Sequence, residues 1–262
     1  MTTSIGNGLY AEFAGENSII LYFLANKGKT STASQDNNKY TIIRHQLPSA
    51  TNISPEINRR VYQACVIIRQ HLTHLIIDLI PSYASILVVF NLSVTDHHQI
   101  LTRLRDLLTQ LPAHEDKFAQ LIKLPVYYSL DYGLDLTRIA ERSRLTVEQV
   151  ITLHQAQEYR VYAIGFAPGF AYLGEVDARI AMPRLASPRV KVPKGAVAIA
   201  DKQTAVYPAE SPGGWNLLGL CPTAMFCPKS KPTMPVAVGD RVKFYAIDKK
   251  EFINLGGCFP ES

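Results

Sequence analysis

Hydrophobic and polar positions in the first half of the chain alternate between the two-residue period of strands and the longer period of helices. Apolar side chains recur every three or four residues after Ser54, and again after Thr95 or Asp96, which predicts two amphipathic helices with capped N-termini. Short apolar runs rich in β-branched and aromatic residues predict four strands, at residues 18–24, 75–80, 85–90 and 120–128. This strand–helix–strand–strand–helix–strand order predicts a ferredoxin-like domain over residues 1–128.

Two segments interrupt this pattern. Residues 26–50 are rich in Asn, Thr, Ser, Lys and Gln, and they are expected to form a polar loop. Residues 129–157 predict a linker of two short helices. Asp135 can cap the first helix, and Thr146 with Gln149 has the spacing of a capping box at the start of the second.

The pattern changes again at residue 158, where short apolar strands begin to alternate with Gly and Pro. That density of strands and turns predicts a closed antiparallel β-barrel over residues 158–262. The chain has 262 residues, which is long enough for two units that each bury a core. We therefore expect an α+β protein in which a ferredoxin-like domain, a helical linker and a barrel follow one another.

The composition of the chain argues against a nucleic-acid-binding protein, a membrane protein and a zinc protein. A net charge of +5 suits small anions, whereas a nucleic-acid binder shows a denser basic face and a reading motif. The apolar run at residues 19–25 is shorter than the roughly 20 residues of a spanning helix, so we expect no membrane segment and a cytoplasmic location. The cysteines lack the spacing of zinc ligands and are expected to be reduced thiols; they are Cys65, Cys221, Cys227 and Cys258.

The stretch from Tyr159 to Leu220 carries the candidate chemistry. Two turn-rich blocks, Gly165–Phe170 and Ser211–Trp215, bracket a run in which residues 178–200 hold five basic residues and no acid. This pattern indicates an anion site, because Arg and Lys bind carboxylate and phosphate groups. The alternative is a solvated strand edge that lysine protects from pairing. The candidate anion ligands are Arg184, Arg189 and Lys194.

Aromatic and polar residues supply further candidates for this site. Trp215 is either a wall of the ligand site or a core aromatic, Tyr172 is expected to face a pocket, and Phe166 is expected in the core. Gln203, Tyr207 and Glu210 are polar groups expected on the same rim. Glu210 is the acid of that group and thus the candidate general base. No metal site is expected, and no Walker A loop occurs in the sequence.

The chain resembles the family that includes the 5-oxoprolinase B subunit, allophanate hydrolase subunit 1 and a sporulation-kinase inhibitor (carboxyltransferase subdomain C and D type). The resemblance covers nearly the whole chain, more weakly in the N-terminal half. It is carried by Gly165–Gly174, Pro183-Arg184, Pro188-Arg189, Val192–Ala200, Gln203-Thr204, Tyr207-Pro208, Ser211–Trp215, Asp135-Leu136 and His154. The chain departs from the family's pattern at Asn91, Leu134, Ala205 and Asn216.

The resemblance implies a cyclophilin-like barrel and one subunit of an ATP-dependent 5-oxoprolinase that converts 5-oxoproline to L-glutamate. It also implies two partners, namely a homologous second barrel (the C-type subunit) and a further 5-oxoprolinase subunit. Fused relatives continue beyond the position of Ser262, so the second barrel is expected on a separate polypeptide, and this chain is expected to be inactive alone. ATP is then bound mainly with those partners.

The same resemblance raises His154, otherwise a structural or solvated histidine on a helix, to a candidate general acid or base. It also strengthens Arg184 and Arg189 as substrate ligands. Two other functions stay open at this point. One is a binding module that inhibits a sensor histidine kinase, and the other is a carboxyltransferase-like subunit of urea or allophanate metabolism.

Overall fold

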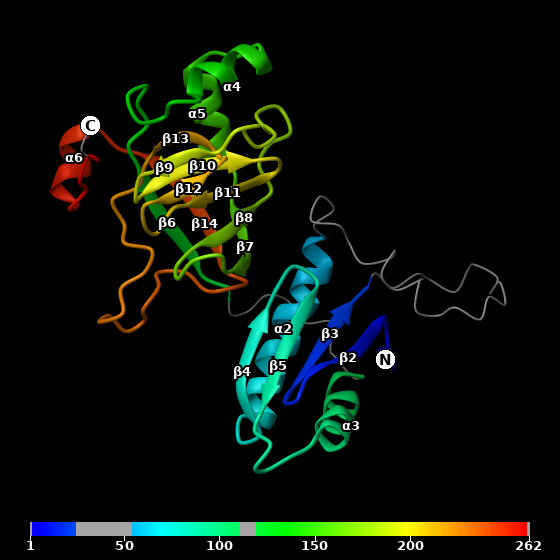
Figure 1. Ribbon diagram of the computed structural model, residues 1–262. Helices are drawn as coiled ribbons and strands as arrows, with labels where there is room; N and C mark the ends of the chain where they lie inside the picture. The colour runs from blue at the N-terminus through cyan, green and yellow to red at the C-terminus, as the bar shows by residue number, and fades with distance from the viewer. Residues whose placement is uncertain (1, 25–53, 110–118, 261–262) are drawn as a thin grey trace, which may run out of the picture. The chain divides into compact units, whose positions relative to one another are not determined.

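The structure, a computed structural model, describes residues 2–24, 54–109 and 119–260. The chain divides into two units, Met1–Lys117 and Phe118–Ser262, each with its own core (Figure 1). The polar loop expected at residues 26–50 lies outside the described residues. Both units contain helices and strands, so the protein is of the mixed α+β class.

The first unit is built on a five-stranded antiparallel sheet with the strand order β1-β2-β3-β5-β4. Its strands are β1 (Thr2–Gly6), β2 (Leu9–Gly15), β3 (Ser18–Phe23), β4 (Ile76–Pro81) and β5 (Ser85–Phe90). Its helices, α2 (Pro55–Leu72) and α3 (His97–Leu108), pack against one face of the sheet. Every second residue of β3 and β5 is fully buried on that face, as the two-residue period requires.

Both helices of the first unit begin at caps that the sequence predicts. The hydroxyl of Ser54 accepts a hydrogen bond from the amide of Ile57 at 3.3 Å. The carboxylate of Asp96 accepts from the amide of His98 at 2.8 Å, so Asp96 and not Thr95 is the cap. The predicted stripe of α2 is confirmed, and its buried members are Ile57, Val61, Cys65, Ile68 and Leu72.

The fourth strand of the expected ferredoxin-like order does not pair in the first unit. That strand, β6 (Leu121–Val126), pairs in parallel with β14 (Arg241–Ala246) of the second unit. In the first unit its place beside β3 is taken by β2, which the sequence pattern did not predict. The N-terminal sheet therefore has the expected β3-β5-β4 core but a different edge, and the boundary lies near residue 118 instead of 128.

The second unit is a seven-stranded sheet that curls into a nearly closed barrel, with the order β13-β10-β11-β8-β7-β14-β6 (Figure 1). Its other strands are β7 (Tyr159–Ile164), β8 (Ala171–Gly174), β10 (Ala196–Ala200), β11 (Gln203–Val206) and β13 (Asn216–Leu220). Tyr127 and Leu220 exchange two backbone hydrogen bonds, of 2.8 and 3.0 Å, and so join the two ends of the sheet. Because β6 and β14 are parallel, the barrel is not wholly antiparallel as expected.

The segment expected to link the two domains packs onto the barrel as part of the second unit. Its helices are α4 (Leu136–Ser143) and α5 (Val147–Ala156). The predicted capping box is present: the amide of Gln149 donates to the Thr146 hydroxyl at 3.2 Å, and the Thr146 amide donates to the Gln149 side chain at 2.8 Å. Leu136, Ile139 and Val150 are fully buried in the barrel core.

Side chains of all seven strands meet in that core, while alternate residues of β10, β11 and β13 lie on the opposite face. This opposite face carries a second apolar cluster beside a two-stranded ribbon, β9 (Arg189–Val192) and β12 (Ser211–Gly213). The C-terminal helix α6 (Lys249–Asn254) adds Phe252 to it. Most of the residues predicted to bind substrate lie on this face.

Candidate functional site

Four aromatic rings form what we call the outer aromatic cluster, made of Phe170, Tyr172, Tyr207 and Trp215. Phe170 is at its centre and is only 2% exposed. The centroid of its ring lies 4.9 Å from that of Tyr172, 5.3 Å from that of Tyr207 and 5.6 Å from that of Trp215. The sequence motifs that predicted a site thus converge on one place in the second unit.

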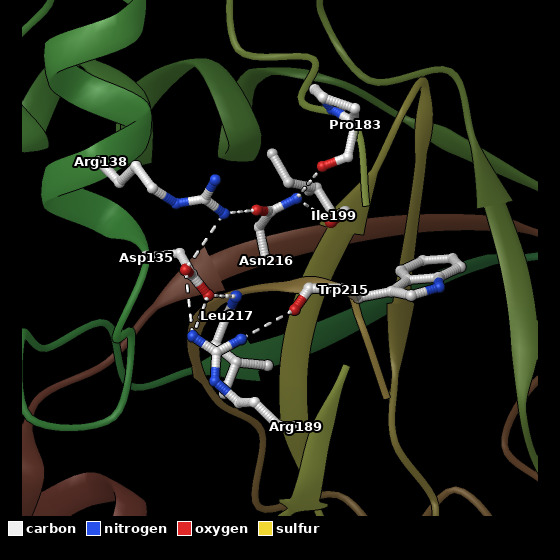
Figure 2. Close-up of polar contacts among 8 residues, drawn as sticks. All are labelled: Asp135, Arg138, Pro183, Arg189, Ile199, Trp215, Asn216 and Leu217. Carbon is white, nitrogen blue, oxygen red and sulfur yellow. Dashed lines mark hydrogen bonds and ion pairs between the residues drawn. The ribbon is translucent and has the colours of Figure 1, made fainter. Parts of the chain in front are cut away.

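Trp215 is packed as a core aromatic residue within the outer aromatic cluster. Its side chain is buried, with 4% exposure, and it packs against Phe170 in the cluster. The guanidinium carbon of Arg184 lies 5.8 Å from the centre of its ring, a cation–π distance. Figure 2 shows the indole pointing away from Asp135 and Arg189, while its backbone carbonyl faces Arg189. The indole is therefore buried on one side and contacts the exposed guanidinium group of Arg184.

The two tyrosines of the cluster present their hydroxyl groups near the same cation. Burial raises the pKa of both Tyr172 and Tyr207, and the positive charge of Arg184 opposes that rise in each case. Tyr207 also takes a backbone hydrogen bond from Trp215. A β-carbon at Gly213 would lie 2.3 Å from the Tyr207 hydroxyl oxygen, so the Pro-Gly-Gly turn gives this phenol the room it needs.

Arg189 is held by a buried carboxylate and is not available to an anion in the way the sequence indicated. Asp135 is 3% exposed, and its carboxylate lies 2.9 Å from an Arg189 nitrogen and 3.2 Å from Arg138 (Figure 2). The amide of Leu217 donates to the same carboxylate at 2.7 Å. Asp135 therefore ties α4 to β9 and β13, instead of capping α4 with its side chain.

Asn216 fixes the loop that carries Arg184. Its side-chain amide donates to the carbonyls of Pro183 and Ile199, each at 3.0 Å, while Arg138 donates to its carbonyl oxygen (Figure 2). The amide of Leu185 donates to the carbonyl of Gly214 at 2.7 Å. Backbone bonds on both sides of Arg184 thus hold its Cα in place while its side chain stays exposed.

The other two residues predicted to bind substrate, Lys194 and Gln203, lie near opposite ends of β11. Lys194 is exposed and precedes Gly195, whose amide donates to the Tyr207 carbonyl at 2.8 Å, so Lys194 lies at the Tyr207 end. Gln203 begins β11 at the opposite end, where it pairs with Gly174. The two-residue period of the strand places Gln203 on the same face as Ala205, which belongs to the apolar cluster of that face.

Glu210, the candidate base, is half exposed on the ribbon. Its carboxylate lies 3.1 Å from the ammonium group of Lys191, and the two side chains are 50% and 66% exposed. Lys191 and Glu210 thus form a solvated ion pair.

His154 is buried in the barrel and held at both ring nitrogens. Nδ1 lies 2.8 Å from the Tyr128 hydroxyl and Nε2 lies 3.0 Å from the Thr204 hydroxyl. Thr204 donates its own proton to the Ala198 carbonyl, so Nε2–H is the donor to Thr204 and Tyr128 donates to Nδ1. Burial lowers the pKa of His154 to about 3. The imidazole is thus neutral and enclosed, with both of its nitrogens engaged in hydrogen bonds inside the barrel.

Sequence reasoning missed three features of this region. Arg138 joins the Asp135 network, and its spacing of three residues from Asp135 on a helix was the available signal. Asn216, noted as a departure from the family pattern, anchors the Arg184 loop. Phe166, expected in the core, is 71% exposed and has a positive φ of 74°.

The described residues contain no group of three or more His, Cys, Asp or Glu side chains arranged to hold a metal ion. Among the helices of those same residues, none combines the length and the apolar character that crossing a bilayer takes. The cysteines of the described ranges are free thiols.

Comparison with known proteins places this fold in a family. Residues 42–236 match the model of the carboxyltransferase domain, subdomain C and D. Over 210 residues the chain is 34% identical to the 5-oxoprolinase B subunit of Bacillus subtilis (strain 168), a match that covers 76% of this chain and 88% of that protein. The 5-oxoprolinase B subunit of Haemophilus influenzae is 39% identical over 60% of this chain and 74% of its own.

A solved structure has a fold similar to that of this chain. The crystal structure of TTHA0988 superposes with a TM-score of 0.67 at 36% identity, over 75% of this chain and 38% of that longer chain. The chain thus spans about two fifths of TTHA0988. The protein belongs to the carboxyltransferase subdomain C and D family, among the relatives of the 5-oxoprolinase B subunit.

Proposed function

We propose that this chain is the B subunit of a 5-oxoprolinase, an enzyme that hydrolyses 5-oxoproline to L-glutamate. The observation that carries the proposal is the 34% identity to the Bacillus subtilis B subunit, because the match spans 88% of that protein and leaves no major part of it without a counterpart. The word subunit in that name implies that other subunits complete the enzyme.

The chemistry accounts for a division of labour between subunits. An unstrained lactam is a poor electrophile, and transfer of a phosphoryl group from ATP to its oxygen creates a leaving group. This chain has no Walker A sequence, so we assign ATP mainly to the partners: a homologous barrel (the C-type subunit) and a further subunit. We place the complex in the cytoplasm and regard the barrel as cyclophilin-like, in line with the family resemblance.

The part we assign to this chain is to bind the substrate carboxylate. Within residues 119–260, Arg184 makes no ion pair, and its guanidinium lies beside the Tyr172 and Tyr207 phenols over the face of Trp215. A guanidinium binds a carboxylate through two parallel hydrogen bonds. Lys194 adds positive charge at the same end of β11, and Arg189 acts indirectly by holding the Trp215 carbonyl.

The two other functions are not favoured. Urea amidolyase of K. lactis has a similar fold, with a TM-score of 0.65 over 96% of this chain and 16% of that one, but only 17% identity. At that identity the likeness concerns the fold alone. Nothing in the geometry of the second unit favours inhibition of a kinase over binding of a small anion.

The proposed function is tested by measuring glutamate release from 5-oxoproline and ATP with the purified partner subunits, in the presence and absence of this chain. We expect release only when the chain, the partners and ATP are all present, and none from the chain alone. Equal release by the partners without the chain would show that it is not a subunit of this enzyme.

A further inference from the structure

Phe166 is the most exposed aromatic residue beside the outer aromatic cluster. Its side chain is 71% exposed, and its φ of 74° lies in the left-handed region that a residue with a β-carbon rarely adopts. Two hydrogen bonds of 3.0 Å close its loop, from the Gly165 amide to the Phe170 carbonyl and from the Phe170 amide to the Ala167 carbonyl. Both involve backbone groups, so the turn itself does not need a phenyl ring at this position.

Strained backbone that the surroundings hold in place is a pointer to function. Here the strained residue sets its ring edge-on to Phe170, with centroids 5.4 Å apart and planes at 74°. Phe170 in turn contacts Tyr172 and Trp215, and the Arg184 guanidinium carbon lies 5.8 Å from the centre of the Trp215 ring. An exposed phenyl group and an exposed cation thus both contact rings of the outer aromatic cluster, Phe166 through Phe170 and Arg184 through Trp215.

A ligand that fits both groups has one apolar, flat part and one anionic part. 5-Oxoproline offers both: the two methylene groups of its lactam ring give it an apolar edge, and the ring carries a single carboxylate. Its hydrolysis product, glutamate, has no ring and adds an ammonium group and a second carboxylate, and this carboxylate is strongly hydrated and costly to place against a phenyl ring. The ammonium group is also repelled by Arg184.

We propose that Phe166 covers the ring of a small cyclic carboxylate whose carboxylate is bound by Arg184, and that it thereby selects the cyclic substrate over the open-chain product. Phe166 is in this sense a specificity-determining residue. The inference rests on the proposed function, since it takes 5-oxoproline as the substrate of the same site.

The test compares the wild-type assembled enzyme with Phe166→Ala, Phe166→Tyr and Phe13→Ala. Alanine keeps the β-carbon and therefore the backbone strain, and an exposed ring contributes little to folding, so all variants should assemble. For Phe166→Ala we expect the KM for 5-oxoproline to rise roughly 10-fold or more, with kcat changed less than about threefold and with inhibition by glutamate unchanged. Phe166→Tyr keeps an aromatic ring and should have the KM of the wild type. Phe13→Ala, at a Phe of the first unit that is 42% exposed, should also leave the KM unchanged.

Two results would overturn the proposal. One is an unchanged KM in Phe166→Ala, and the other is a loss that disappears when more of the partner proteins is added, because Phe166 would then be a contact between subunits. If the wild-type complex releases no glutamate, the proposed function itself fails. The role of Phe166 is then tested by titrating the isolated chain with 5-oxoproline and following the fluorescence of Trp215, the sole Trp of the chain. If the wild type gives no saturable response, or if Phe166→Ala binds with the same affinity, the proposed role of Phe166 is rejected.

Discussion

Asp135 is the residue on which the geometry of the candidate site depends most. A carboxylate that is 3% exposed would be costly in the absence of partners, and here it meets two guanidinium groups and one backbone amide. Removing it leaves Arg189, which is 24% exposed, beside the barrel with its charge unpaired. Asp135 therefore contributes to the stability of the fold. Through Arg189 it also fixes the position of the Trp215 carbonyl, to which Arg189 donates a hydrogen bond.

We expect Asp135→Ala to lower the free energy of unfolding by about 3–5 kcal/mol, the cost of breaking a buried ion pair on one side. Urea unfolding followed by Trp215 fluorescence measures this change. Glu158→Ala is the matched control, because its pair with Arg241 is 39% and 50% exposed and should be worth less than about 1 kcal/mol. Equal losses in the two variants would contradict the role given to Asp135.

His154 predicts a particular dependence of stability on pH. Burial lowers its pKa to about 3 in the folded chain, whereas the unfolded chain takes up this proton near pH 6.5. Above pH 6.5 both states are neutral at this residue, and below it the unfolded state alone binds the proton. Stability should therefore fall with decreasing pH, by up to about 1.4 kcal/mol per pH unit, until about pH 3.

The measurement is the unfolding free energy of wild type and of His154→Gln at about pH 7.5 and about pH 5. We expect the wild type to lose more stability than the variant on acidification, because glutamine does not titrate. Parallel changes in both proteins would mean that the histidine is protonated in the fold, and a catalytic role for it would be open again.

At the residue scale, the sequence predicted which residues lie close together better than it predicted what each of them contacts. Pro-Gly turns and an acid-free basic run marked Arg184, Tyr172, Tyr207 and Trp215, which the fold brings together. The partner of Arg189 was not predictable, because Asp135 lies 54 residues away and no local pattern couples the two positions.

At the scale of elements, the barrel closes where two backbones come close together. A β-carbon at Gly219 would lie 2.5 Å from the Tyr127 carbonyl oxygen, at the bridge that joins the ends of the sheet. We expect Gly219→Ala to lower stability by roughly 1–3 kcal/mol, the usual cost of overpacking. Gly165→Ala, where no atom lies within 4 Å of the added carbon, should be nearly neutral by the same thermal or urea unfolding measurement. A neutral Gly219→Ala would contradict the closure.

Helices and central strands were predictable because caps and periodicity are local signals. The β1–β2 hairpin was overlooked although Asn7-Gly8 marks its turn, and both residues have the positive φ, 51° and 72°, of a type I′ turn. The partner of β6 was not predictable, because its apolar run suits either sheet and the pairing with β14 joins residues about 120 positions apart.

At the scale of the whole molecule, the boundary between the units can be tested with two fragments. Residues 118–262 contain all seven strands of the barrel, whereas residues 129–262 lack β6, which supplies Leu124 and Val126 to the core. We expect the longer fragment to unfold cooperatively in urea and the shorter one to lack a cooperative transition. A shorter fragment as stable as the longer one would show that β6 is not part of the barrel.

The central claim is that this chain binds the carboxylate of 5-oxoproline through Arg184, and the KM of the assembled enzyme for 5-oxoproline tests it most directly. Arg184→Ala should raise this KM by a factor of roughly 10–150, equivalent to the loss of about 1.5–3 kcal/mol for a charged hydrogen bond. Arg142→Ala, at an exposed position in the last turn of α4, should leave it unchanged. An unchanged KM in Arg184→Ala, with the complex intact, would contradict the account.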